Sequence, residues 1–157
     1  MTDGRKDRRM EKENRQGKEK PESELLQQVM ARSLANPFPK YCHIQITVLE
    51  KDHVEVCVDL EGRDELKNYA GFVHGGLFFT MADFCAATTA RTDGRKYVTL
   101  QADTHYTGNV TEGRITAKSR IVHRGRSSVL VHVDIVDQKE KPLCCSDVTM
   151  FCVGSYV

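Results

Sequence analysis

The chain has 157 residues, and 23 Lys and Arg residues balance 22 Asp and Glu residues to a formal net charge of +1. This length suits one domain, and the balanced charge gives no general attraction to nucleic acid or to a membrane surface. No apolar run approaches the roughly 20 residues of a membrane span, and the charged start lacks a signal peptide's apolar stretch, so a cytoplasmic protein is expected.

The cysteines and histidines indicate neither disulfides nor a metal site. The 6 cysteines lack a CxxC spacing and lie mostly in apolar or alternating segments, so we predict thiols. Cys144 and Cys145 are neighbours, and on a strand their side chains would point to opposite faces. The histidines show no HExxH motif and no mixed Cys and His ligand spacing, so no metal site is predicted.

Residues 1–20 are expected to be a disordered charged tail, because Met10 is their one large apolar side chain. The folded domain is expected over 21–157, with a helix at about 22–35 that ends at Asn36-Pro37. The helix is predicted from apolar residues at helical spacing: Leu25, Leu26, Val29, Met30 and Leu34.

Six strands are predicted around a central apolar segment. The first two, 43–50 and 53–60, are joined by Lys51-Asp52 in a predicted hairpin, and Val54, Val56 and Val58 of the second share one face. Later strands are predicted at 97–106, 114–123, 128–137 and 143–153. Because short turns join these later strands, we expect them to be antiparallel.

The central segment, NYAGFVHGGLFFTMADFCAATTA (68–90), predicts a loop followed by a helix of about 17 residues, apolar nearly all round. A sheet curled around this helix would bury it, which gives an α+β fold class. Two features need a reason: a carboxylate, Asp83, in an apolar helix, and Gly75-Gly76 at the helix start.

The stretch NYAGFVHGGLFFTMAD, followed by VTLQADTHYTGNVTEG, resembles the hotdog-fold thioesterases, in particular the PaaI-like acyl-CoA thioesterases, over about residues 40–153. The resemblance implies an antiparallel sheet wrapped around a long central helix, and a homodimer or homotetramer. It implies hydrolysis of an acyl-CoA thioester with no cofactor, coenzyme A being part of the substrate. It places the catalytic site at Asn68, His74, Gly75 and Asp83, with a helper hydroxyl near Thr99.

Thioester hydrolysis needs donors for the developing oxyanion and a base or nucleophile opposite them. Gly75 and Gly76 lie at a predicted helix N-terminus, so we expect the Gly75 N–H to polarise the carbonyl; the alternative is that both glycines only form a tight turn. His74 is expected to cap the helix and position the loop; the alternative is that it acts as a base. Asn68 is expected to hold the loop or a water; the alternative is an ordinary turn residue. Asp83 is the candidate base or nucleophile, with direct attack and activation of water both open; the alternative is a buried Asp whose carboxylate is satisfied by backbone groups or Thr hydroxyls.

Gly75 and Asp83 are eight residues apart on one helix, about 12 Å along its axis, so one carbonyl carbon cannot contact both. If both act on one substrate, Asp83 comes from a second chain related by a two-fold axis. The sequence therefore predicts a composite site and an obligatory dimer.

The coenzyme is expected at the turn His123, Arg124, Gly125, Arg126 and Ser127, where arginines and backbone N–H groups could hold phosphate. The alternative is an ordinary solvated turn; Arg91 and Lys96 are further candidates. Gly76 is expected to let the substrate come close. An apolar acyl pocket is suggested by aromatic and sulfur-containing side chains that could equally belong to the core: Phe72, Phe78, Phe79 and Met81.

Two other functions fit the same fold. A hotdog hydratase or dehydratase needs an acid and base pair, and the single carboxylate in the helix counts against it. A non-catalytic acyl-CoA sensor of the kind that carries a DNA-binding domain would need more chain than the charged residues ahead of the core supply.

Overall fold

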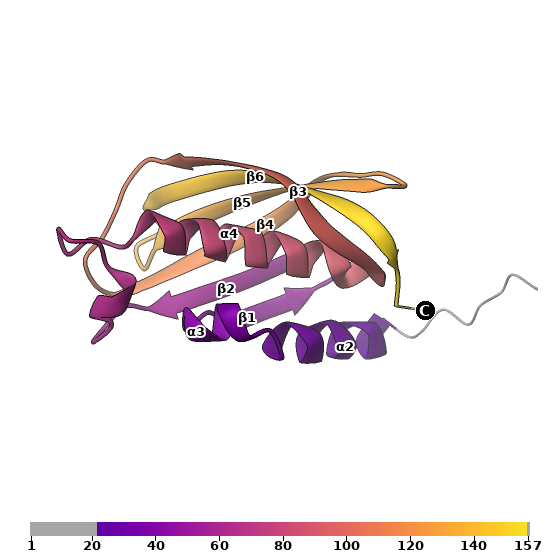
Figure 1. Ribbon diagram of the computed structural model, residues 1–157, viewed down its shortest axis with the longest axis horizontal. Helices are drawn as coiled ribbons and strands as arrows, with labels where there is room; N and C mark the ends of the chain where they lie inside the picture. Colours follow the sequence, from indigo (N-terminus) through magenta and orange to yellow (C-terminus); the bar gives the residue numbers. More distant parts are fainter. Residues whose placement is uncertain (1–21, 157) are drawn as a thin grey trace, which may run out of the picture.

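The apolar central segment forms one long helix, α4 (Gly75–Ala90), and a six-stranded sheet curves around it (Figure 1). The computed structural model describes residues 22–156, so the tail expected at 1–20 lies outside the described residues. Ten of the helix's side chains are buried, and α4 packs against five strands, from β2 to β6. The expected hotdog architecture is confirmed.

The sheet is antiparallel throughout, in the order β1-β2-β4-β5-β6-β3. Its strands are β1 (Gln45–Glu50), β2 (His53–Asp59), β3 (Arg95–Tyr106), β4 (Arg114–Arg124), β5 (Ser128–Asp137) and β6 (Pro142–Ser155). All six predicted strands and the hairpin at Lys51-Asp52 are confirmed, with ends that differ by at most two residues. However, β3 and β4 are consecutive in the chain without pairing, and β3 instead lies at the sheet edge beside β6.

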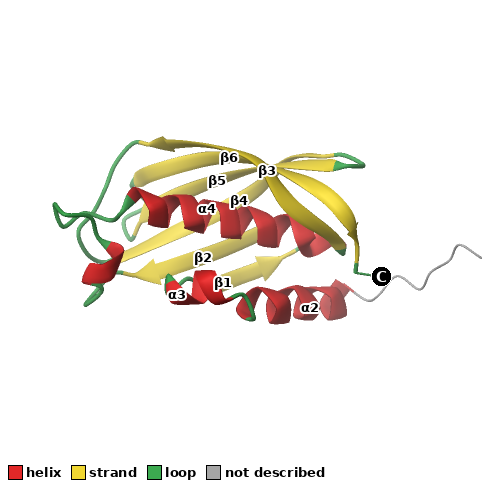
Figure 2. Cartoon of the chain, in the orientation of Figure 1, coloured by secondary structure: helices red, strands yellow, loops and turns green. Residues whose placement is uncertain are grey.

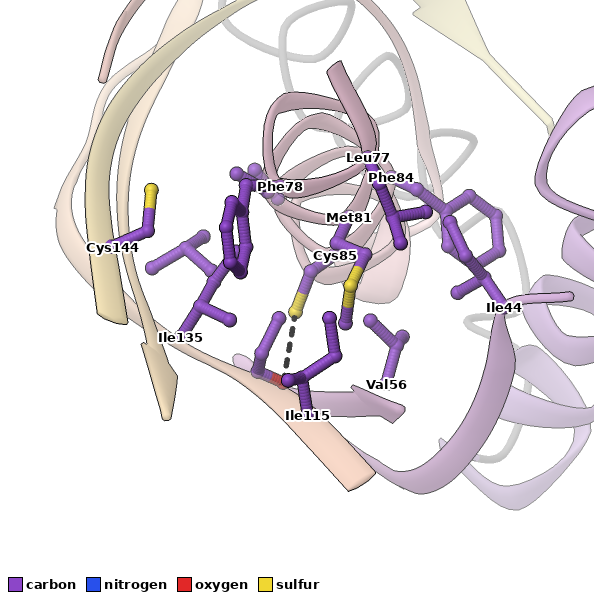
Figure 3. Close-up of a cluster of buried hydrophobic side chains, with 14 of the residues drawn as sticks. Ile44, Val56, Leu77, Phe78, Met81, Phe84, Cys85, Ile115, Ile135 and Cys144 are labelled. Atoms are coloured by element: carbon purple, nitrogen blue, oxygen red, sulfur yellow. Dashed lines mark hydrogen bonds between the residues drawn. The ribbon is translucent and has the colours of Figure 1, made fainter. Parts of the chain in front are cut away.

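The core lies between α4 and the concave face of the sheet. Phe78 and Met81 point from α4 toward strand residues such as Ile115, and both are at most 1% exposed (Figure 3). Their suggested role in an acyl pocket is therefore wrong, and they are core residues. Val54, Val56 and Val58 share the buried face of β2, as predicted.

Two helices precede the sheet, where the sequence predicted one. The first, α2 (Glu22–Leu34), lies beside β1 and buries Val29 (Figure 2). The second, α3 (Pro37–Tyr41), was missed because Asn36-Pro37 looked only like a stop signal. The Asn36 side chain caps α3 by accepting from the Phe38 N–H at 3.4 Å, and proline fits the first helical turn because no N–H is needed there. Within residues 22–156, no helix is long and apolar enough to cross a membrane.

Candidate active site

The loop that enters α4 is organised around Asn68. Its side-chain oxygen accepts hydrogen bonds from the N–H groups of Ala70, at 2.9 Å, and Phe72, at 3.2 Å. Its own N–H donates to the Phe72 carbonyl at 2.7 Å. Asn68 therefore stabilises a compact turn that ends at Phe72. The next residue, Val73, is fully buried and anchors the loop in the core.

His74 caps the N-terminus of α4, and it binds the N–H of only one of the two glycines. Its Nδ1 accepts from the Gly76 N–H at 2.9 Å, which requires the tautomer whose proton lies on Nε2. The Gly75 N–H, in contrast, donates to no group within residues 22–156. One unpaired donor is thus left at the positive end of the helix dipole, which is the position required to stabilise an oxyanion.

The two glycines also differ in the space around them. A Cβ atom on Gly76 would lie 3.0 Å from His74 Nδ1, so any larger residue there would push the capping ring out of place. A Cβ on Gly75 would meet only the Tyr106 ring, at an ordinary 3.6 Å, and Gly75 has no left-handed backbone conformation. The tight-turn alternative therefore accounts for Gly76, while nothing within the described chain requires glycine at position 75.

Sequence reasoning missed two residues that hold this region. The Tyr106 hydroxyl donates to the Gly75 carbonyl at 3.3 Å, and the Asn109 side chain donates to the Val73 carbonyl at 3.0 Å. Both come from the end of β3 and the turn after it. They are more than 30 residues away from their partners in the chain, so no local spacing signals the contact.

Asp83 lies on the half of α4 that the sheet leaves uncovered, and it is half-buried. Thr99 of β3 donates its hydroxyl proton to Asp83 Oδ1 at 2.6 Å. The predicted pair of Asp83 with a hydroxyl on the next strand is thus brought together, and the bond fixes the carboxylate's orientation. Because Thr99 binds one oxygen, the other remains available to a water or a substrate.

The Asp83–Thr99 pair opens into a cavity of about 390 Å³. Its wall is mostly apolar and is formed by α4, β3 and the segment around α3, with side chains that include Phe38, Phe79, Phe84 and Met150. Of the aromatic residues expected in an acyl pocket, Phe79 lines this cavity. Such a lining suits an acyl group.

A thiol two residues from Asp83 is no competing nucleophile. Cys85 is fully buried against the sheet, and burial raises the pKa of its thiol to about 12 (Figure 3). The thiol donates to the Val54 carbonyl at 3.3 Å. It therefore stays protonated and turned away from the cavity.

The turn expected to bind coenzyme A is held in place by Arg95 of β3. This guanidinium donates to the carbonyls of Gly125, at 3.2 Å, and Arg126, at 2.7 Å. Arg124 is occupied within the chain, because it pairs with Asp52 at 2.6 Å and also with Asp93. The Arg126 guanidinium and the side chains of His123 and Ser127 make no hydrogen bond or ion pair with any described residue and remain accessible.

The described chain offers no ready metal centre. No three His, Cys, Asp or Glu side chains within residues 22–156 are placed to hold a metal ion. All six cysteines are free thiols, of which Cys145 and Cys152 are half-buried and the other four buried.

Comparison with known proteins identifies the family of the chain. A family model described as the thioesterase superfamily matches residues 70–144, the stretch that contains α4 and β3 to β5. A hypothetical thioesterase of Streptococcus pneumoniae, solved with coenzyme A, is 30% identical and has a TM-score of 0.68, covering 73% of this chain and 91% of the other. The chain belongs to the thioesterase superfamily.

Two other members extend the similarity. The structure of PaaI from Escherichia coli, from the phenylacetic acid degradation operon, has a TM-score of 0.77 at 19% identity, covers 83% of this thioesterase-family chain and 97% of PaaI, and shows a shared fold. A 1,4-dihydroxy-2-naphthoyl-CoA hydrolase of Listeria monocytogenes is 26% identical over 110 residues, 68% of this chain and 88% of that enzyme.

Proposed function

We propose that this protein is an acyl-CoA thioesterase, which hydrolyses an acyl-CoA to a free acid and coenzyme A. The observation that carries the proposal is Asp83, oriented by Thr99 at 2.6 Å and facing an apolar cavity. The coenzyme A bound to the pneumococcal relative and the naphthoyl-CoA substrate in the name of the Listeria relative support a CoA thioester.

In the proposed reaction, Asp83 takes a proton from water, and the water oxygen adds to the thioester carbonyl. The tetrahedral oxyanion accepts a hydrogen bond from the Gly75 N–H, which the chain leaves unpaired. Collapse of this intermediate breaks the C–S bond, and the proton passes to the departing thiolate. Direct attack by Asp83, through an anhydride that water then opens, gives the same products. Either route uses only water and the chain's own groups, and no cofactor.

We further propose that each site is shared between two copies of the chain. Gly75 and Asp83 are eight residues apart on α4, about 12 Å, which is too far for one carbonyl carbon to contact both. The side of α4 that the sheet leaves uncovered carries Gly76, Phe79, Thr80, Asp83 and Ala87. Antiparallel packing of two such faces about a two-fold axis brings Asp83 of one copy to the Gly75 loop of the other.

The edge of the sheet supports the same dimer. β3 is an edge strand, and its Val98 and Leu100 are 51% and 66% exposed, as is much of Phe151 on β6. An exposed apolar edge strand invites pairing with a second chain. Pairing of two β3 strands would cover this surface beside Thr99, and association of two dimers would give the tetramer.

For the coenzyme we propose the accessible side chains of the 123–127 turn. Arg126, with Ser127 and His123, presents a cation and hydroxyl and imidazole groups that suit phosphate. Arg124 takes no direct part, since its guanidinium is committed to Asp52 and Asp93; it holds the turn in place.

The test is to incubate the purified protein with acyl-CoA thioesters, from acetyl to long-chain and aryl, together with a thiol reagent. A thioesterase releases free coenzyme A thiol, and the carboxylic acid appears in equal amount. Hydration of an enoyl-CoA without thiol release would instead identify a hydratase. Tight binding without turnover of any thioester would identify an acyl-CoA sensor.

A further inference from the structure

Arg91 lines the cavity that contains Asp83, and it has no carboxylate partner within residues 22–156. Two other arginines near this end of the molecule are neutralised by carboxylates: Arg95 pairs with Asp93 at 2.7 Å, and Arg124 with Asp52 at 2.6 Å. Arg91 is half-buried, so its charge is only partly solvated. A half-buried cation facing a largely apolar cavity favours an anionic or strongly accepting ligand group.

The side chain of Arg91 is held in one orientation by neutral acceptors. Its Nε donates to the Ala87 carbonyl at 2.9 Å, and Nη2 donates to the hydroxyls of Ser33, at 3.3 Å, and Thr88, at 3.2 Å. Nη1 donates to no described group. Among the described residues, Arg124 Nε is the one buried side-chain nitrogen or oxygen without a hydrogen-bond partner. Since Arg91 Nη1 also lacks a partner, it must be at least partly accessible to solvent. Nη1 is thus the guanidinium nitrogen that the described chain leaves without a partner, in a residue that lines the cavity.

The position of Arg91 on α4 sets its distance from the reacting centre. Asp83, Ala87 and Arg91 follow one another at four-residue intervals, so they lie on one face of the helix. The bond from Arg91 Nε to the Ala87 carbonyl folds the side chain back toward Asp83. The guanidinium therefore lies between one and two helical turns beyond the level of Asp83, roughly 6–12 Å along the axis, with the small side chain of Ala87 between them.

We infer that the cavity takes acyl groups that end in a carboxylate, with Arg91 binding the distal carboxylate while Asp83 serves the thioester carbonyl. The substrate class is the CoA monothioester of a short dicarboxylic acid. The apolar wall contributed by Phe38, Phe79 and Phe84 would pack against the methylene groups between the two ends. This inference rests on the proposed thioesterase function and adds the acyl group to it.

The coenzyme's own phosphates do not fit the position of Arg91. The pantetheine arm between sulfur and pyrophosphate is about as long as four extended residues, roughly 13 Å. An extended arm from a thioester held at Asp83 therefore places the phosphates beyond a guanidinium that lies at most about 12 Å away along the helix. The group that reaches Arg91 is on the acyl side of the thioester or is the part of pantetheine next to the sulfur.

The experiment compares acyl-CoAs of equal chain length with and without the distal carboxylate: glutaryl-CoA with pentanoyl-CoA, and adipyl-CoA with hexanoyl-CoA. We expect the wild-type protein to show a kcat/KM at least about tenfold higher for the carboxylated member of at least one pair. In Arg91→Met, which keeps the apolar stem, this ratio should fall to about one or below. Arg91→Lys, which keeps the charge, should retain part of it, and Arg120→Met, on the exposed outer face of β4, should leave the ratio unchanged.

A general loss of activity lowers kcat/KM equally for both acyl-CoAs of a pair and leaves their ratio unchanged. Partial unfolding of a variant therefore cannot account for a fall in the ratio. A wild-type ratio of one or less, or an equal loss on both members of each pair in Arg91→Met, would overturn the inference and leave the thioesterase function standing. If no thioester is hydrolysed, the proposed function fails, and the inference is judged by calorimetry. Asp83→Asn protein should then bind glutaryl-CoA at least about tenfold more tightly than pentanoyl-CoA, and equal affinities would overturn it.

Discussion

At the scale of single residues, the start of α4 separates a structural glycine from one that the described chain does not require. Gly76 has its N–H bound by His74 and a Cβ there would crowd the His74 ring, whereas Gly75 has an unpaired N–H and ordinary space around its Cα. A substrate carbonyl approaching the Gly75 N–H would be the group that needs this space. Substitution by alanine should therefore have opposite consequences at the two positions.

Gly75→Ala is expected to fold with a thermal midpoint equal to or slightly above wild type, because alanine favours a helix by up to about 1 kcal/mol over glycine. Its turnover should fall about tenfold or more, since the added methyl group keeps the carbonyl from the N–H. Gly76→Ala should instead lose about 1 kcal/mol of stability through the damaged cap. Calorimetry, steady-state kinetics and the measured dimer content of both variants check this, and wild-type turnover in Gly75→Ala would contradict the oxyanion assignment.

Asp83→Asn preserves the shape of the side chain and removes its charge. We expect turnover to fall at least about a hundredfold while substrate binding is largely kept, since the base or nucleophile is lost. Asp103→Asn is a suitable control, because Asp103 is an exposed carboxylate on β3 whose one ion pair within residues 22–156 is with His105, at 3.7 Å. Near wild-type hydrolysis by folded Asp83→Asn protein would refute the catalytic role.

At the scale of elements, a polar cluster ties the end of α4 to two strands, β3 and β4, and to the β1–β2 hairpin. Asp93 lies in the 3₁₀ turn after α4 and accepts from Tyr97 at 2.7 Å and from Arg95 at 2.8 Å. Burial alone would raise the pKa of Asp93, but these bonds and the charge of Arg124 outweigh it and hold that pKa below its usual value. The cluster thus stabilises the protein while Asp93 is ionised.

The pH dependence of stability follows from the direction of this shift. Because the pKa of Asp93 is lower in the folded state, its contribution is complete above the unfolded pKa, about 3.9, and is lost as the pH falls through the folded pKa. Asp93→Asn should cost about 2 kcal/mol at pH 7, and its deficit relative to wild type should shrink below about pH 4. Urea unfolding of both proteins from pH 7 to pH 3 measures this; a constant deficit would argue against an ionised Asp93, and Asp103→Asn should show almost none at any pH.

The sequence predicted those parts of the site that depend on local order along the chain. The cap by His74, the glycines and Asp83 all belong to one loop and one helix, so their spacing sufficed. The commitment of Arg124 was not predictable, because its partner Asp52 is 72 residues away, and a paired arginine and a solvated one look alike in a turn. The helix α3 was missed because Asn36 both follows one helix and caps the next.

At the scale of the whole molecule, the 12 Å between Gly75 and Asp83 predicts complementation between two defective chains. Asp83→Asn and His74→Ala chains, mixed equally and allowed to exchange, should regain about a quarter of wild-type activity. Half the dimers are then mixed, and each mixed dimer holds one site built from the intact Asp83 of one chain and the intact loop of the other. Both parents must first be shown to fold and to be nearly inactive.

A matched control uses two defects on the same half of the site. Asp83 and Thr99 are bonded within one chain, so mixing Asp83→Asn with Thr99→Val leaves a defect in every site. That mixture should show no more than the mean of its parents. Proven exchange without recovery in the first mixture would overturn the shared site.

The place of β6 in the sheet also bears on how the chain is made. β6 lies between β5 and β3 and is the strand that both of them pair with, although it comes last of the three in the chain. During synthesis β3 therefore waits without a neighbouring strand until residues 142–155 have left the ribosome, and its apolar edge remains open to wrong partners throughout that time. The candidate site shares this delay, because Thr99 has no fixed place beside Asp83 until β3 is paired. A nascent chain can therefore assemble the Asp83–Thr99 pair only after β6 has been made.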